Sequence, residues 1–280
     1  LSPEGPPEVK VNRHLPLLLV TTALGCGAGE ASTPPDPLAA RFLADPAFHW
    51  RSSHAPTLRL YAQPNSWASR HLDEITAAAG EARAHAFSLL EAPDDRSTYD
   101  LFLVEDRSEM MRLTGRRERG TTFPEERTVA LIASEHWRPF LRHELMHAAS
   151  IRTWGHAAAG DWVQEGVATD AEGACGRYDV DAVARFLVHA GRAITLADLT
   201  GRFREQDDLT AYMLAGSFVR HLRTRHGIGV VHAAWTGQLQ RATGRTLESL
   251  YREWLEEMKS VPASVVDWDS LARNGCGWRS

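Results

Sequence analysis

Two histidines stand four residues apart at His143 and His147, and Glu144 directly follows the first of them. Successive residues of an α-helix advance by about 100°, so both imidazoles would fall on nearly the same line and could converge on one metal ion. Glu144 would then sit beside them, close enough to hold a water molecule on that ion. Because the chain contains 13 histidines, the pattern could also arise by chance, and only the surrounding sequence can decide between the two interpretations. The spacing predicts a metal site able to activate water.

A catalytic zinc site needs a third protein ligand and one position open to water. Metzincins supply a third histidine soon after the second, but this requires glycine at position 150 and histidine at position 153, where the chain has Ser150 and Thr153. Glu165, eighteen positions beyond the second histidine, is a candidate third ligand, and an ordinary surface glutamate is the alternative interpretation. His156 and Asp161, both in a predicted loop, are the alternative ligands.

The segment around Glu165 gives this pattern a family resemblance. WVQEGVA, residues 162–168, lies on a predicted helix and matches the W-x-x-E-G-x-A segment of the gluzincins, the metallopeptidase clan of thermolysin and aminopeptidase N. The chain resembles this clan over roughly residues 127–259. The resemblance implies one zinc ion per chain, held by His143, His147 and Glu165.

The resemblance also implies roles outside the ligand set. AYMLAGSFV, residues 211–219, is similar to the Y-x-x-x-G-S-F-V pattern of smaller exported proteins of the peptidase-MA-like group. Tyr212 stands where aminopeptidase-N relatives have a tyrosine that steadies the oxyanion, and a core tyrosine is the alternative. Glu144 would take the proton of the attacking water and pass it to the leaving amine. The sequence has no G-x-M-E-N segment for gripping a free amino terminus, so an aminopeptidase is not supported.

Two further parts of the site are expected near these residues. Helical projection places Glu172 almost in line with Glu165, where it could hydrogen-bond a ligand histidine and fix its tautomer, and a solvated acid is the alternative. In zincins the strand before the motif helix commonly lies along the cleft edge. RTVALIAS, residues 127–134, is placed to pair there with an extended substrate.

These residues need strands and helices to position them. The patterns predict strands at 57–62, 99–106 and 127–134 and helices at 68–91 and 107–115. The motif helix follows, with Leu141, Leu145 and Ala148 on its buried side. Further helices are predicted at 161–173, 179–191, 208–226, 228–242 and 246–259. This order predicts an α+β fold, with a small N-terminal mixed sheet and helices followed by an all-helical C-terminal half. The resemblance implies that this fold is zincin-like, with the active site in the cleft between the two halves.

The N-terminus is typical of an export signal. Basic residues precede a short apolar run, LPLLLVTTALG, which falls short of the roughly 20 apolar residues that span a bilayer. ALGCGAGEASTPPDP resembles a bacterial lipoprotein signal, although Ala23 departs from the large aliphatic residue usual there. The resemblance implies a signal peptide over 1–25, a lipid on Cys26 that anchors the protein to the membrane of the cell envelope, and a flexible tether over 26–41. A plain secretory signal and a secreted protein are the alternative.

The remaining chain is expected to form the peptidase domain over 42–260 and a C-terminal tail over 261–280. If Cys26 is lipidated, Cys175 and Cys276 remain as an even pair in a compartment that permits disulfides. A bridge between them would tie the tail to the region after the active site, and two free thiols are the alternative.

Composition and charge restrict the partners. Charged residues make up 24% of the chain, the net charge is -5, and there is no basic stripe, so nucleic acid is not an expected partner. Three histidines of the late helices are expected to be surface or capping residues: His221, His226 and His232. The predicted function is zinc-dependent hydrolysis of peptide bonds in a peptide or protein substrate. A non-catalytic surface binding protein on the same scaffold is the alternative, and zinc hydrolysis of a non-peptide amide also stays open.

Overall fold

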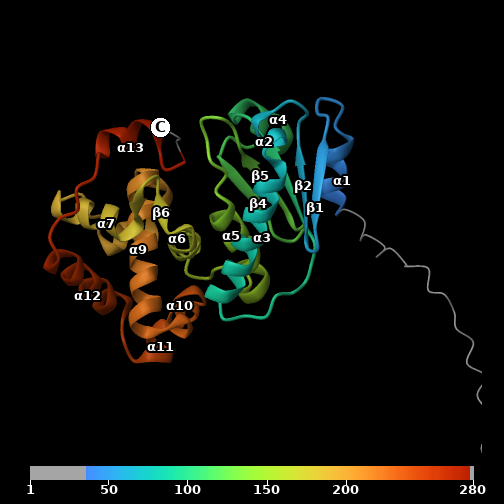
Figure 1. Cartoon of the computed structure of the whole chain (residues 1–280). Coiled ribbons are helices and arrows are strands. Elements are labelled where there is room, and N and C mark those ends of the chain that lie inside the picture. Colours follow the sequence, from blue (N-terminus) through green and yellow to red (C-terminus); the bar gives the residue numbers. More distant parts are fainter. Residues whose placement is uncertain (1–35, 278–280) are drawn as a thin grey trace, which may run out of the picture. The chain divides into compact units, whose positions relative to one another are not determined.

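A five-stranded mixed sheet lies in the first half of this computed structural model, which describes residues 36–277 (Figure 1). In spatial order its strands are β1 (Arg51–Ala55), β2 (Leu58–Ala62), β3 (Tyr99–Val104), β5 (Thr128–Ile132) and β4 (Gly120–Phe123). The three inner strands run parallel, and each outer strand is antiparallel to its neighbour. The three predicted strands are the three inner ones. The predicted signal peptide, Cys26 and the tether as far as residue 35 lie outside the described residues.

The sheet has a different edge from the one predicted. β5 pairs with β3 on one side and β4 on the other, so the expectation that residues 127–134 lie along the edge is wrong. β4 takes that place, and no other strand of the described residues pairs with its outer side. β4 has only four residues and begins at Gly120, which is too short for a period-two pattern to stand out. β1 was missed because its residues are mostly polar and exposed, as on many edge strands.

Helices cover both faces of the sheet. α3 (Leu72–Leu89) and α5 (Leu141–Trp154) pack on one face, and α1 (Pro37–Ala44) and α4 (Arg107–Thr114) pack on the other. The first helix begins at Pro37 and buries Ala39 and Phe42. The folded part therefore begins before the expected boundary at residue 42, because part of the predicted tether supplies apolar side chains to the core.

The second half of the chain is almost wholly helical. Its helices are α6 (Asp161–Glu172), α7 (Val180–His189), α8 (Leu196–Gly201), α9 (Asp208–His226), α10 (Ile228–Trp235), α11 (Leu239–Thr243), α12 (Leu247–Ser260) and α13 (Trp268–Asn274), with a 3₁₀ turn, η1, at Phe203–Glu205. The prediction of a helix over 208–226 is confirmed. A small hairpin of β6 (Ala174–Cys175) and β7 (Tyr178–Asp179) interrupts the helices. The fold is mixed α+β, as predicted.

Two predicted helices are each broken in two. Residues 68–91 form α3 and a short helix before it, α2 (Trp67–Arg70), and His71 separates the two helices. Residues 228–242 form α10 and α11, and between them Gly237 has a φ of 69°. This left-handed conformation suits glycine and cannot continue a right-handed helix. Helical periodicity alone predicted one continuous helix in each case and gave no sign of the break.

Helix α5 packs against both halves of the fold. Leu141, Leu145 and Ala148 enter the core formed with the sheet, as predicted, whereas Met146 and Ala149 enter the core of the C-terminal helices. In Figure 1 this helix stands between the strands and the helices coloured yellow to red. Burial on two sides leaves one strip of the helix for the polar residues of the motif.

The C-terminal segment returns to both halves. A disulfide joins Cys276 to Cys175 of β6, the short strand after α6, so the predicted pair is bonded. On the other side the Arg138 backbone N–H donates to the Gly277 carbonyl at 2.8 Å, and Arg119 Nη2 donates to the Asn274 carbonyl at 3.2 Å. Within residues 36–277, no helix combines the length and the hydropathy that crossing a bilayer requires.

Candidate functional site

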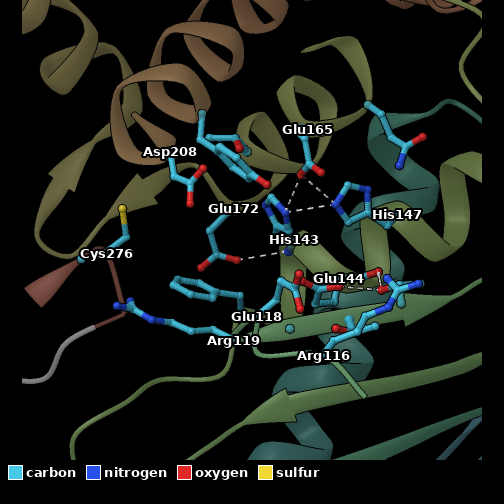
Figure 2. Close-up of a pocket in the computed structure, with 18 of the residues that line it drawn as sticks. Arg116, Glu118, Arg119, His143, Glu144, His147, Glu165, Glu172, Asp208 and Cys276 are labelled. Atoms are coloured by element: carbon cyan, nitrogen blue, oxygen red, sulfur yellow. Dashed lines mark hydrogen bonds and ion pairs between the residues drawn. The ribbon is translucent and has the colours of Figure 1, made fainter. Parts of the chain in front are cut away.

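The three predicted metal ligands lie together. His143 and His147 project from α5 and Glu165 from α6, and Figure 2 shows the three side chains pointing toward one another. The His143 and His147 Nε2 atoms are 3.1 Å apart, and they lie 3.3 and 3.2 Å from Glu165 Oε2. A tetrahedral zinc ion with bonds of about 2.0–2.1 Å separates its ligand atoms by about 3.3 Å. The donor set and its spacing therefore fit zinc.

The alternative third ligands lie elsewhere. His156 is exposed and its Nε2 is 2.9 Å from Glu125 Oε1. Asp161 Oδ2 accepts a hydrogen bond from Arg204 Nε at 2.7 Å. Neither residue is near enough to complete the group formed by the two motif histidines, so Glu165 is the third member.

Charge at this group favours a cation. Burial alone raises the pKa of Glu165, but the adjacent His147 and His143 imidazoles lower it well below its usual value. Burial lowers the pKa of His143, yet the hydrogen bond to Glu165 and the charge of Glu144 raise it overall. Glu165 is thus held as a carboxylate. The group favours a positive charge beside this carboxylate, either a proton on a facing imidazole or a metal cation in the place of that proton.

Glu144 lies beside the ligand group and is held by the edge strand. Its side chain is only 6% exposed, and its Oε2 accepts a hydrogen bond from Thr122 Oγ1 at 2.7 Å. Thr122 Oγ1 also lies 3.1 Å from the Glu144 carbonyl oxygen. At Gly120 a Cβ atom would come within 2.2 Å of Glu144 Oε1, so only glycine leaves room for this carboxylate. The sequence did not predict these roles of Gly120 and Thr122, because both residues belong to β4, a strand that the sequence pattern did not reveal.

Arg204 of η1 is a second unpredicted member of the site. Its Nη2 donates to Glu165 Oε1 at 2.9 Å, and its Nη1 donates to the Tyr212 hydroxyl at 3.1 Å. One guanidinium therefore fixes a predicted ligand and the predicted oxyanion donor together. Tyr212 also stacks on His143, with ring centroids 6.0 Å apart. No spacing rule links Arg204 to the motif, since it lies on an irregular turn far along the chain.

Glu172 contacts His143, although not as predicted. Its Oε2 accepts a hydrogen bond from the His143 backbone N–H at 3.2 Å, and no hydrogen bond joins it to the imidazole (Figure 2). His143 lies in the first turn of α5, where backbone N–H groups lack partners inside the helix, and Phe140 at the N-cap supplies no side-chain bond. Glu172 therefore caps α5 from a neighbouring helix. Burial raises the pKa of Glu172 above its usual value despite the opposing effect of His143.

A large pocket opens in front of the ligand group. Its volume is about 1100 Å³, and its walls come from β4, α5, α6, the start of α9 and the C-terminal segment. Figure 2 shows Arg116 and Glu118 on the side of Glu144 and Asp208 and Cys276 on the side of Glu172, with the Arg119 side chain extending toward Cys276. The walls thus carry charges of both signs. No protein-family model matches the chain, and the comparison with curated proteins returns no significant match.

Proposed function

We propose that this chain is a zinc metallopeptidase of the gluzincin type with a zincin-like fold. The observation that supports the proposal most strongly is the group formed by His143, His147 and Glu165, whose ligand atoms lie within 3.3 Å of one another at the pocket. Two imidazoles and one carboxylate are a common ligand set for catalytic zinc. Glu144, next to this group, supplies the base that hydrolysis requires.

In this proposal zinc supplies Lewis acidity, which polarises the scissile carbonyl and makes a water molecule easier to deprotonate. Glu144 Oε1 takes the proton of that water, because Oε2 already accepts a hydrogen bond from Thr122. The same carboxyl group then delivers the proton to the leaving amine. Thr122 and Gly120 keep the carboxylate in one orientation, so little reorganisation is needed during the reaction.

Tyr212 is the proposed donor to the oxyanion. Burial raises the pKa of Tyr212, and the Glu165 charge raises it further, so the phenol keeps its proton. Its oxygen accepts a hydrogen bond from Arg204, which leaves the hydroxyl proton for another acceptor in the pocket. Arg204 thereby orients the donor while it holds Glu165.

The proposed substrate is a peptide or protein segment in extended conformation. The outer side of β4 is a pocket wall, and its backbone could pair with such a segment by strand addition. This role was expected of residues 127–134. Because β5 is paired on both sides, we propose the role for the edge strand Gly120–Phe123 instead. We also propose that the protein acts outside the cytoplasm, held by a lipid on Cys26. The Cys175–Cys276 disulfide supports an oxidising compartment.

The proposal is tested by replacing Glu144 with glutamine. The E144Q protein is expected to bind zinc with the wild-type stoichiometry and to hydrolyse peptides about 10²- to 10⁴-fold more slowly, because the base is lost while the ligands remain. Metal analysis gives the first quantity, and mass spectrometry of a diverse peptide pool gives the second.

Other outcomes of the same experiment would contradict the proposal. Wild-type cleavage by E144Q would exclude Glu144 as the base. Wild-type protein that binds zinc at His143, His147 and Glu165 but cleaves no peptide would favour the surface binding protein instead. Protein that binds no zinc, and whose melting temperature a chelator leaves unchanged, would exclude both zinc-dependent functions.

A further inference from the structure

A second group of histidine and carboxylate side chains lies at the C-terminal end of α9. His221 and His226 belong to the last turns of this helix, and Glu253 belongs to α12. His226 Nε2 is 3.3 Å and His221 Nε2 is 3.6 Å from Glu253 Oε1, and the three ligand atoms all lie within 4.8 Å of one another. The sequence predicted surface or capping histidines here, but His221 is only 5% exposed.

The tautomer of His221 directs a lone pair at Glu253. Its Nδ1 lies 2.8 Å from Glu257 Oε2, and a carboxylate can only accept, so Nδ1 carries the hydrogen. In the neutral imidazole Nε2 is then an acceptor. This arrangement, in which a carboxylate orients the imidazole from behind, is the one that metal-binding histidines usually have.

Hydrogen bonding leaves the two facing nitrogens unsatisfied. His221 Nε2 and His226 Nε2 are buried, and neither has a hydrogen-bond partner among the described residues. Both face the same oxygen of Glu253 at ion-pair distance. These two nitrogens and Glu253 Oε1 can each accept a hydrogen bond or bind a cation through a lone pair. A single cation placed between them would therefore satisfy all three atoms.

Two arginines hold the carboxylates of this group in place. Arg245 Nη2 contacts Glu253 Oε2 at 2.5 Å, which leaves Oε1 toward the histidines. Arg225 Nη2 contacts Glu257 Oε1 at 2.6 Å, which leaves Oε2 for His221. Each carboxylate therefore uses one oxygen for an arginine and presents the other to an imidazole. Such fixed orientation lowers the cost of assembling a metal site.

We propose that His221 Nε2, His226 Nε2 and Glu253 Oε1 form a second binding site for a divalent transition metal, zinc above all. Two imidazoles and one carboxylate suit zinc better than calcium or magnesium, which prefer oxygen ligands. The ion would join the end of α9 to α12, so it would stabilise the helical half and take no part in the pocket. The proposal does not depend on peptidase activity, and it raises the expected zinc content from one ion per chain to two.

Zinc stoichiometry of four proteins tests the site. After chelation and reloading, wild-type protein is expected to hold about two zinc ions per chain, the H147A and H226A variants about one each, and the double variant about none. A failure of the pocket site would look different, because wild type and H147A would then both hold one ion and H226A none. The H232A variant, on the neighbouring α10, is the matched control and should equal wild type.

Conservative variants show whether the ion or only the fold is affected. E253Q removes a ligand charge and is expected to lose the second ion. E257Q removes only the group behind His221 and should weaken zinc binding in an H147A background by about 10- to 100-fold. Circular dichroism checks that each variant is folded. The proposal is overturned if H226A and E253Q, both folded, bind as much zinc as wild type, since the cluster would then be only an ion-pair network between two helices.

Discussion

At the scale of single residues, the two central carboxylates of the candidate site are positioned by side chains and backbone outside the recognised motifs. Glu144 is oriented by Thr122 and by the room that Gly120 leaves, and Glu165 is oriented by Arg204. Each contact joins segments that are distant in sequence. The motifs therefore contain the groups to which we assign the chemistry, and residues outside the motifs fix the geometry of those groups.

Gly120 provides a direct test of this positioning. In G120A the new Cβ would lie 2.2 Å from Glu144 Oε1, so the carboxylate has to move. Displacing a catalytic group by about 1 Å can cost about 100-fold in rate, so peptide hydrolysis should fall by about that factor while zinc content stays unchanged. Steady-state kinetics and metal analysis measure both quantities.

A glycine far from the pocket supplies the control. No atom lies within 4 Å of a Cβ added at Gly80 in α3, so G80A should keep full activity and gain up to about 1 kcal/mol of stability from helix propensity. If G120A is as active as G80A, the close contact between Gly120 and Glu144 does not matter for catalysis.

Arg204 should affect metal affinity more than folding. The R204A variant releases Glu165 Oε1 and the Tyr212 hydroxyl, and its zinc affinity is expected to fall about 10- to 100-fold, as for other groups that orient metal ligands. Competition with a chromophoric chelator measures this change. Arg202, whose side chain pairs with Asp198 on the surface, gives the control R202A. Equal affinity in the two variants would contradict the role assigned to Arg204.

At the scale of elements, the ligand helix α6 and helix α9 pack with their backbones in close approach. A Cβ at Gly166 would lie 2.6 Å from Val219 Cγ2 and 2.9 Å from the Ala215 carbonyl oxygen, and a Cβ at Gly216 would lie 2.5 Å from Thr169 Cγ2. Each helix therefore places a glycine against the other. This contact gives a physical reason for the glycine that follows Glu165 in the WVQEGVA segment.

Replacing Gly166 should destabilise the protein. In G166A the extra methyl meets a backbone oxygen that cannot move freely, and overpacking of this kind costs about 1–3 kcal/mol, against a gain of about 1 kcal/mol in helix propensity. Urea denaturation with a chelator present measures the free energy of unfolding without a contribution from zinc. G80A is expected to be the most stable protein, followed by wild type and then G166A. A G166A protein as stable as wild type would show that α6 and α9 can move apart at no cost in free energy.

The predictability of each element depended on its length and exposure. α9 was located from sequence because nineteen residues give several turns of helical pattern. β4 was not, because four residues beginning with glycine carry little pattern, and it becomes a strand through pairing with β5. The edge role of residues 127–134 was assigned to the wrong strand for the same reason. The sequence of one strand does not show whether another strand will pair with its free side.

At the scale of the whole molecule, the C-terminal segment links the two halves across one side of the pocket. Cys276 is bonded to Cys175 in the helical half, while Asn274 and Gly277 accept hydrogen bonds from the sheet half. Residues of this segment form part of the pocket wall. A chain end bonded on both sides restricts how far the halves can separate.

Loss of the disulfide should loosen this link. The bond closes a loop across 101 residues, and the C175S/C276S double variant is expected to lose about 2–5 kcal/mol of unfolding free energy. It should also be cut faster by trypsin at Arg273, which is exposed on the segment. Chemical denaturation and timed proteolysis measure the two effects. Wild-type values in both assays would mean that the hydrogen bonds alone hold the segment.

The sequence by itself determined the candidate site residues and the helices that carry them. His143, Glu144 and His147 are fixed on one strip of α5 by helix geometry, and Glu165 was identified by a motif on a predicted helix. Only the tertiary structure decided that Glu172 caps α5, that Gly120, Thr122 and Arg204 orient the carboxylates, and that His221 and His226 meet Glu253. These contacts join residues far apart in the chain, and periodicity along a sequence carries no information about such distances.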